Sequence, residues 1–177
     1  RELGLNSEFT SRVMNRLGES FSIQNLRRSI DAEVAKERQS FGILDEDLRT
    51  AHGIWMLARS NYEVQFEPEQ QLSERILFPA TPSQSNGIED ARFVRFQNDD
   101  GSYIYYATFT AFDGKVVMPE LVETVDFLRF RFITLNGPAA QNKGMAMFPR
   151  KINGHYAMLS RQDNESIYLM FSDNIHF

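Results

Sequence analysis

Two parts of the second half of this chain resemble each other at an offset of about fifty residues. Both are aromatic, strand-like runs interrupted by a glycine-containing turn: Phe93–Phe96 with Ser102–Ala107, and Phe148–Ile152 with His155–Met158. The segments Asp126–Phe130 and Asp173–Phe177 form a further similar pair. A repeat of this length, made of short antiparallel strands, is typical of the blades of a β-propeller. We therefore predict a propeller, with an ordinary β-sandwich as the alternative.

Only two repeat units are visible, whereas a closed propeller needs at least about four. We therefore expect the chain to be the amino-terminal part of a longer protein, with a truncated propeller over residues 61–177. Within this region Tyr62, Val64 and Phe66 alternate with polar residues, which predicts a strand. The run from Tyr103 to Ala111 is β-branched and aromatic throughout, which predicts a strand buried on both faces.

Residues 1–60 follow a helical period instead, and we interpret them as a small α-helical extension. Capping residues mark three helix starts: Asn6 and Ser7, Ser22, and Asp45. The second helix carries many charges, which we expect to form a solvated face: Arg27, Arg28, Asp31, Glu33, Lys36, Glu37 and Arg38. Trp55 falls on an apolar stripe and is interpreted as a packing residue. The extension is a candidate contact between copies in a homo-oligomer.

The composition excludes several classes of function. A formal net charge of -5 and a pI near 5.3 argue against nucleic acid or an anionic membrane as a partner. The absence of cysteine excludes thiol catalysis and disulfides, and the histidines have no metal-ligand spacing. The sequence shows neither a signal-peptide pattern nor an apolar run that would span a bilayer. We therefore expect a cytoplasmic protein without a metal or cofactor.

The segment Gly87-Ile-Glu-Asp-Ala-Arg92 is the strongest candidate for a functional site. It lies between a turn-rich run and the strand-like Phe93–Phe96, so a rigid element can aim its charged side chains at a ligand. In a regular strand Asp90 and Arg92 would emerge on one face and Glu89 on the other. By themselves, Asp90 and Arg92 are most simply interpreted as a structural ion pair.

Five motifs follow one another along the chain: Gly87–Arg92, Tyr105–Gly114, Asn142–Ile152, Gly154–Arg161 and Phe171–Phe177. Taken in this order they resemble glycoside hydrolase family 130, the β-mannoside phosphorylases and related mannosidases. The similarity spans residues 73–177, and the order of the motifs makes it specific. It implies an all-β five-bladed propeller, of which this chain holds about two blades, preceded by the helical extension.

The resemblance implies a carbohydrate-active enzyme that cleaves β-mannosides by inverting phosphorolysis and releases mannose 1-phosphate. Asp90 matches the family's general acid, and Arg92 and Asp113 match residues that contact the substrate. Lys143 and Arg161 match phosphate-binding residues, as expected for a co-substrate that carries up to two negative charges. The implied partners are a β-mannoside oligosaccharide and inorganic phosphate, with no further cofactor.

Two departures from the family pattern leave alternatives open. The motif proline is Ala91 here, and Ser160 stands before Arg161 where the family often has histidine. An inverting β-mannosidase is therefore an alternative, and it would need a second carboxylate about 6.5–9.5 Å from the acid. Three glutamates are candidates for that carboxylate: Glu120, Glu123 and Glu165. A propeller that binds glycans or protein partners without catalysis is a second alternative.

Overall fold

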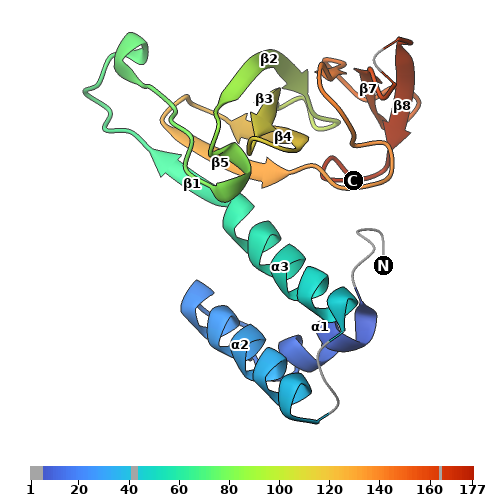
Figure 1. Cartoon of the computed structure of the whole chain (residues 1–177). Coiled ribbons are helices and arrows are strands. Elements are labelled where there is room, and N and C mark those ends of the chain that lie inside the picture. The colour runs from blue at the N-terminus through green and yellow to red at the C-terminus, as the bar shows by residue number, and fades with distance from the viewer. Residues whose placement is uncertain (1–5, 41–43, 164) are drawn as a thin grey trace. The chain divides into compact units, whose positions relative to one another are not determined.

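The computed structural model describes residues 6–40, 44–163 and 165–177. The chain divides into two compact units, a helical unit that ends at Arg59 and a β unit that begins at Ser60 (Figure 1). Each unit encloses hydrophobic clusters of its own. None of the described helices is long and apolar enough to cross a membrane.

The helical unit consists of α1 (Ser7–Met14), α2 (Ile23–Ser40) and α3 (Asp45–Ser60). Two of the predicted caps are formed by side-chain hydrogen bonds. The Asn6 side chain accepts hydrogen bonds from the backbone N–H groups of Glu8 and Phe9, at 2.9 and 3.3 Å. Ser22 Oγ accepts one from the backbone N–H of Asn25 at 3.2 Å. These bonds satisfy N–H groups that have no partner within the helix, so α1 and α2 begin directly after their capping residues.

Glu33 departs from the predicted solvated face of α2. Its side chain is only 1% exposed and accepts hydrogen bonds from Arg12 Nε at 2.6 Å and Arg16 Nη2 at 2.7 Å. The prediction is wrong at this residue because Glu33 follows the buried Ile30 by one helical turn and so faces α1. Burial acts to raise the pKa of Glu33, but the hydrogen bonds from Arg12 and Arg16 outweigh burial and lower that pKa.

The β unit contains two antiparallel sheets, which we call sheet A and sheet B (Figure 1). Sheet A has the order β1-β5-β4-β3-β2: β1 (Tyr62–Gln65), β2 (Ile88–Gln97), β3 (Tyr103–Phe112), β4 (Val117–Thr124) and β5 (Arg129–Thr134). Sheet B has the order β6-β7-β8: β6 (Ala146–Met147), β7 (Tyr156–Ser160) and β8 (Tyr168–Ser172). Two short 3-10 helices, η1 (Leu72–Glu74) and η2 (Pro82–Gln84), lie between β1 and β2. The β-rich second half predicted from the sequence is thereby confirmed.

The sequence repeat corresponds to two meanders of the same connectivity. Strands β2-β3-β4 and β6-β7-β8 each pair antiparallel with their neighbours. The segment Asp173–Phe177 directly follows β8, and the similar segment Asp126–Phe130 begins two residues after the end of β4 and runs into β5. Neither sheet closes on itself in the part of the chain that the structure describes. The antiparallel sheets are established, while the five-bladed propeller stays a prediction.

Sheet A is buried on both of its faces. One face packs on sheet B through a cluster that includes Phe96 and Tyr106 from sheet A and Met147 and Met158 from sheet B. The other face carries a second cluster, with these buried residues: Ala107, Phe109, Ala111, Val122, Phe130 and Phe132. Strand β3 contributes to both clusters, which confirms the prediction that it is buried on both faces.

Candidate functional site

A β-bulge interrupts β2 within the candidate segment. The register against β3 shifts between Glu89 and Arg92, so that Asp90 and Ala91 together lie opposite Phe109. Asp90 has a φ of +58°, in the left-handed region that Asp tolerates better than most residues. The expectation of a regular strand is therefore wrong here, because the extra residue changes the direction of the Asp90 side chain. Because β2 is the edge strand of sheet A, the bulge disturbs the pairing of only one neighbour.

The bulge brings the carboxylate of Asp90 to the guanidinium of Arg92. Arg92 Nη2 lies 2.8 Å from Asp90 Oδ2, and Arg92 Nε donates to Asp90 Oδ1 at 3.3 Å, which makes the pair bidentate. The side chains of Asp90 and Arg92 are 43% and 40% exposed, so a ligand can reach both. Arg92 Nη1 also donates to the carbonyl of Gly144 at 3.1 Å. Arg92 is thus held between its own strand and the loop that joins β5 to β6.

The same loop carries Lys143, another predicted site residue. Lys143 Nζ lies 3.3 Å from Glu89 Oε1, so a second ion pair connects the loop to β2. Arg161, which directly follows β7, packs its side chain against Gly144. The structure therefore gathers Arg92, Lys143 and Arg161 around Gly144, although they come from three separate segments.

A buried hydrogen bond fixes the loop in this place. Thr108 Oγ1, on β3, donates to the carbonyl of Met145 at 2.6 Å. Thr108 is buried and is the direct neighbour of Arg92 in the sheet. This bond anchors Met145, the residue after Gly144, and thereby holds Gly144 next to Arg92.

Asp113 lies in the turn between β3 and β4, beside the start of β2. Its Oδ1 accepts hydrogen bonds from the backbone N–H groups of Lys115 and Val116, at 2.8 and 2.7 Å. These bonds hold the pKa of Asp113 below its usual range. The backbone of Phe112 exchanges hydrogen bonds with Asn86 and Gly87, which brings the turn near the candidate segment. The described hydrogen bonds of the carboxylate serve the turn, so sugar binding by Asp113 stays a prediction.

Two hollows flank the first part of β2. One, of about 270 Å³, is lined by polar and apolar residues: Asn86, Gly87, Ile88, Glu89, Thr110, Phe112, Val117 and Lys143. The other, of about 300 Å³, has Asp90 beside the following apolar residues: Leu77, Ile88, Phe93, Phe109, Val122 and Phe132. A sugar ring offers apolar faces and polar edges, and both kinds of surface are found here.

Glu120, a candidate for the base of a hydrolase, lies in a buried polar network instead. It is 1% exposed, and its two carboxylate oxygens accept hydrogen bonds from Ser83 Oγ at 2.9 Å and Gln84 Nε2 at 2.7 Å. Burial raises the pKa of Glu120. The network anchors η2, which leads directly into the segment Gly87–Arg92.

The other two candidate bases are also placed elsewhere. Glu123 Oε1 lies 2.9 Å from Arg131 Nη1 in an ion pair on sheet A. Glu165 is exposed in the connection between β7 and β8. No hydrogen bond or ion pair within residues 6–40, 44–163 and 165–177 brings any of the three glutamates to Asp90.

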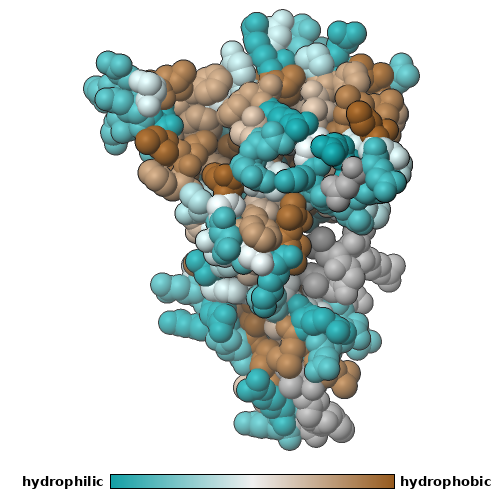
Figure 2. All heavy atoms as spheres, turned by 45° about the horizontal axis from the view of Figure 1, so that its top comes forward, coloured by the Kyte–Doolittle hydropathy of each residue, from teal (hydrophilic) through white to brown (hydrophobic). Residues whose placement is uncertain are grey.

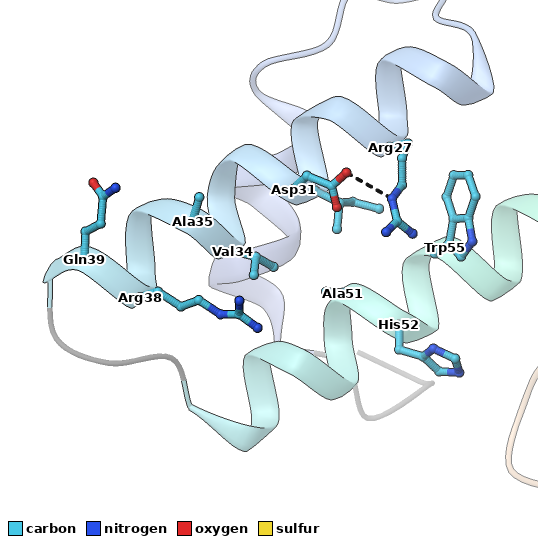
Figure 3. A pocket seen from close by; sticks show the side chains of 10 residues that line it. Arg27, Asp31, Val34, Ala35, Arg38, Gln39, Ala51, His52 and Trp55 are labelled. Atoms are coloured by element: carbon cyan, nitrogen blue, oxygen red, sulfur yellow. Dashed lines mark hydrogen bonds and ion pairs between the residues drawn. The ribbon is translucent and has the colours of Figure 1, made fainter.

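A larger hollow, of about 590 Å³, lies between α2 and α3 in the helical unit (Figure 3). Arg27 and Asp31 form an ion pair of 3.0 Å at one end of it, and the Arg27 guanidinium lies 5.0 Å from the centre of the Trp55 ring. Trp55 packs against the core of the helical unit, which confirms its predicted role. Within the described residues no three His, Asp or Glu side chains are placed to hold a metal ion.

Sequence reasoning missed two residues of this site, Thr108 and Gly144, and it did not predict the ion pair of Glu89 with Lys143. The sequence Asn142-Lys143-Gly144 signals a turn, so it would have indicated a tight loop around Lys143. Nothing in the sequence distinguishes Thr108 from its neighbours on β3, because its partner Met145 is close only in the folded protein.

Asp90 is paired with Arg92 and lines one hollow, and the loop that holds Arg92 also carries Lys143 and contacts Arg161. Such a combination of a carboxyl group and basic side chains can serve acid catalysis in the presence of an anion. A scan against models of known protein families finds no match. Among curated proteins, the chain is 32% identical over 111 residues to "1,2-beta-oligomannan phosphorylase" of Thermoanaerobacter sp. (strain X514). This alignment covers 59% of this chain and 34% of that protein. It is 36% identical over 91 residues to "Beta-1,2-mannobiose phosphorylase" of Listeria innocua serovar 6a, covering 51% of this chain and 24% of that one.

A solved structure of the Listeria innocua beta-1,2-mannobiose phosphorylase, in complex with beta-1,2-mannobiose, aligns with a TM-score of 0.47 and 31% identity. The alignment covers 56% of this chain and 28% of that one. The sequence matches confirm the resemblance to the β-mannoside phosphorylases of glycoside hydrolase family 130. The chain spans at most 34% of the length of the two curated relatives named here.

Proposed function

We propose that this protein acts in the inverting phosphorolysis of β-mannosides and releases mannose 1-phosphate. One observation carries the proposal: Asp90 lies beside Arg92, and Lys143 and Arg161 are brought to the same loop residue, Gly144. The names of the two curated relatives supply the substrate class. The five-bladed propeller that would surround this site is part of the same proposal.

In the proposed reaction Asp90 is the general acid. A phosphate oxygen forms a bond to the anomeric carbon while the bond from that carbon to the glycosidic oxygen breaks. The proton of Asp90 passes to the departing oxygen, directly or through a sugar hydroxyl. The two bonds change on opposite faces of the sugar, so the configuration is inverted.

The basic residues would bind the phosphate. Arg92 uses three N–H donors in its bonds to Asp90 and Gly144 and keeps the rest of its donors for a ligand. Lys143 supplies a compact charge, and Arg161 supplies a second planar donor set. A phosphate that attracts Arg92 would weaken its bond to Asp90. Asp113 would contact the sugar from the neighbouring turn.

The test is product formation from β-manno-oligosaccharides and inorganic phosphate. We expect mannose 1-phosphate from the wild type and a loss of at least about a hundredfold in Asp90→Asn, since general acid catalysis contributes factors of this size. Asp99→Asn is the matched control, because Asp99 is an exposed carboxylate paired with Lys151 outside the site. Equal rates in Asp90→Asn and the wild type would contradict the assignment of Asp90.

An inverting β-mannosidase is the second candidate, and Ser160 is the observation that favours it. Ser160 is buried, so it is no substitute for a histidine at the phosphate. Free mannose released at the same rate with and without phosphate would support hydrolysis. Sugar binding that persists in Asp90→Asn, with no product under any acceptor, would support a binding protein.

A further inference from the structure

The loop around Lys143 follows an unusual backbone path. Asn142 and Gly144 have φ values of +64° and +81°, so left-handed residues stand on both sides of Lys143. Asn and Gly are the residues that adopt this conformation most readily. Directly after them, the carbonyl of Met145 is held by Thr108 on β3. The loop is therefore tightly bent and fixed against sheet A, which leaves Gly144 little freedom to move away from Arg92.

Two arginine side chains occupy the space around the α-carbon of Gly144. A Cβ atom at this position would lie 3.4 Å from Arg161 Cδ and 3.6 and 3.8 Å from Arg92 Nη2 and Nη1. These are ordinary contact distances, so a methyl group would fit. Any atom beyond the Cβ would have to enter the space that Arg92 and Arg161 now take.

Arg161 Cδ and both Nη atoms of Arg92 border the same space at Gly144, so the side chains of the two arginines come together there. Asp90 balances Arg92 from one side. The carbonyl of Gly144 accepts from Arg92 Nη1 and so fixes the orientation of the guanidinium plane. A tetrahedral anion with several acceptor oxygens can bind donors from both arginines at once.

We propose that Gly144 is a positioning residue for phosphate. Its lack of a side chain sets how closely Arg92 and Arg161 approach each other, and this separation sets the affinity for the anion. The inference rests on the proposed phosphorolysis. It adds to the phosphate site a residue that carries no charge.

A series of substitutions at Gly144 tests the inference, with Gly101 as the matched control. Gly101 has a φ of +85°, close to that of Gly144, but a Cβ there would meet no heavy atom within 4 Å. Asn tolerates this backbone conformation, so Gly144→Asn and Gly101→Asn carry similar backbone strain and differ in what the side chain meets. We expect Gly144→Ala to change the KM for phosphate little, although the positive φ makes alanine cost stability there. Gly144→Asn should raise the KM for phosphate about tenfold or more. The KM for the mannoside should stay nearly unchanged, and Gly101→Asn should match the wild type in both KM values.

Two results would overturn the inference. One is a wild-type KM for phosphate in Gly144→Asn. The other is an equal rise of both KM values together with a larger fall in Tm than in Gly101→Asn, which would show a purely structural role.

If the wild type yields no mannose 1-phosphate, the proposed function fails, and the inference is then tested by calorimetry with inorganic phosphate alone. Phosphate binding by the wild type that is lost in Gly144→Asn supports the inference. Equal binding by the two proteins, or none by the wild type, overturns it.

Discussion

Glu120 is a buried carboxyl group whose described hydrogen-bond partners, Ser83 and Gln84, are neutral. Burial raises its pKa, so the folded protein keeps this proton at pH values where the unfolded chain has lost it. The proton therefore stabilises the fold fully below the pKa of the unfolded chain. This stabilisation is lost as the pH rises through the pKa of the folded state.

We expect Glu120→Gln to remove this pH dependence. The glutamine carbonyl can accept from Gln84 and its amide can donate to Ser83 Oγ, so the network is kept without a charge to bury. Urea unfolding from about pH 5 to 8 should show that stability declines more with rising pH in the wild type than in the variant. Glu123→Gln, on the same strand, should keep the wild-type slope. An unchanged slope in Glu120→Gln would contradict the prediction, and a selective loss of hydrolysis would identify Glu120 as the base.

The sequence predicts these residues only in part. Asp90 and Arg92 are two positions apart, so their proximity was predictable, but the bulge that joins them depends on pairing with β3. The gathering of Lys143 and Arg161 with Arg92 was implied by the family resemblance alone. Glu120 was a candidate base, and its anchoring role was unpredictable because its partners on η2 are distant in sequence.

The loop between β5 and β6 depends on Thr108, and Thr108→Val tests this dependence. Valine has nearly the same shape but leaves the carbonyl of Met145 without its donor, which should cost about 1–3 kcal/mol of stability. Phosphorolysis should fall as well, because the loop carries Lys143 and Gly144. Thr110→Val is the stability control, since Thr110 is equally buried on β3 and shows no described bond to the loop. Equal stabilities of the two variants would show that the Thr108 bond does not hold the loop.

The contact of α1 with α2 depends on Glu33, and Glu33→Gln should weaken it. The variant loses a buried carboxylate that binds both Arg12 and Arg16, so we expect a loss of about 2–3 kcal/mol at neutral pH. The lowered pKa of Glu33 means that its contribution is present above the pKa of the unfolded chain and is lost as the pH falls through the folded value.

Helical circular dichroism during acid titration measures the contribution of Glu33. Below about pH 4.5 the difference between the wild type and Glu33→Gln should shrink. Asp31→Asn is the control, because Asp31 forms an exposed pair with Arg27 that contributes less than about 0.5 kcal/mol. A loss in Glu33→Gln no greater than in Asp31→Asn would contradict the structural role of Glu33.

Helices and strands were predictable where local signals mark them. Asn6 and Ser22 act as caps through bonds to residues two or three positions away, so the starts of α1 and α2 follow from the sequence. The position of β1 was also predictable from its alternating residues. Its pairing with β5 was not, because that register joins neighbouring strands whose residues, such as Tyr62 and Phe132, are far apart in the sequence.

The two meanders of the β unit leave one sheet face uncovered. Met158 and Met170 of sheet B point to sheet A, whereas the alternating neighbours Leu159, Leu169 and Phe171 are exposed. Hydrophobic side chains reach the surface of the β unit (Figure 2). Because β8 is also an edge strand, this face is suited to packing against a further sheet, as the proposed propeller requires.

The double variant Leu169→Thr/Phe171→Thr tests whether this face associates with other sheets. Leu169 and Phe171 are 53% and 52% exposed, and threonine keeps the strand propensity while it removes apolar surface. The wild-type chain should self-associate and bind a hydrophobic dye, and the double variant should do both less at an unchanged circular dichroism spectrum. Leu72→Thr/Phe78→Thr is the control, since these residues are 61% and 68% exposed outside both sheets. If the control lowers association as much as the sheet B variant, the face of sheet B has no special role and the case for a third packed sheet loses this support.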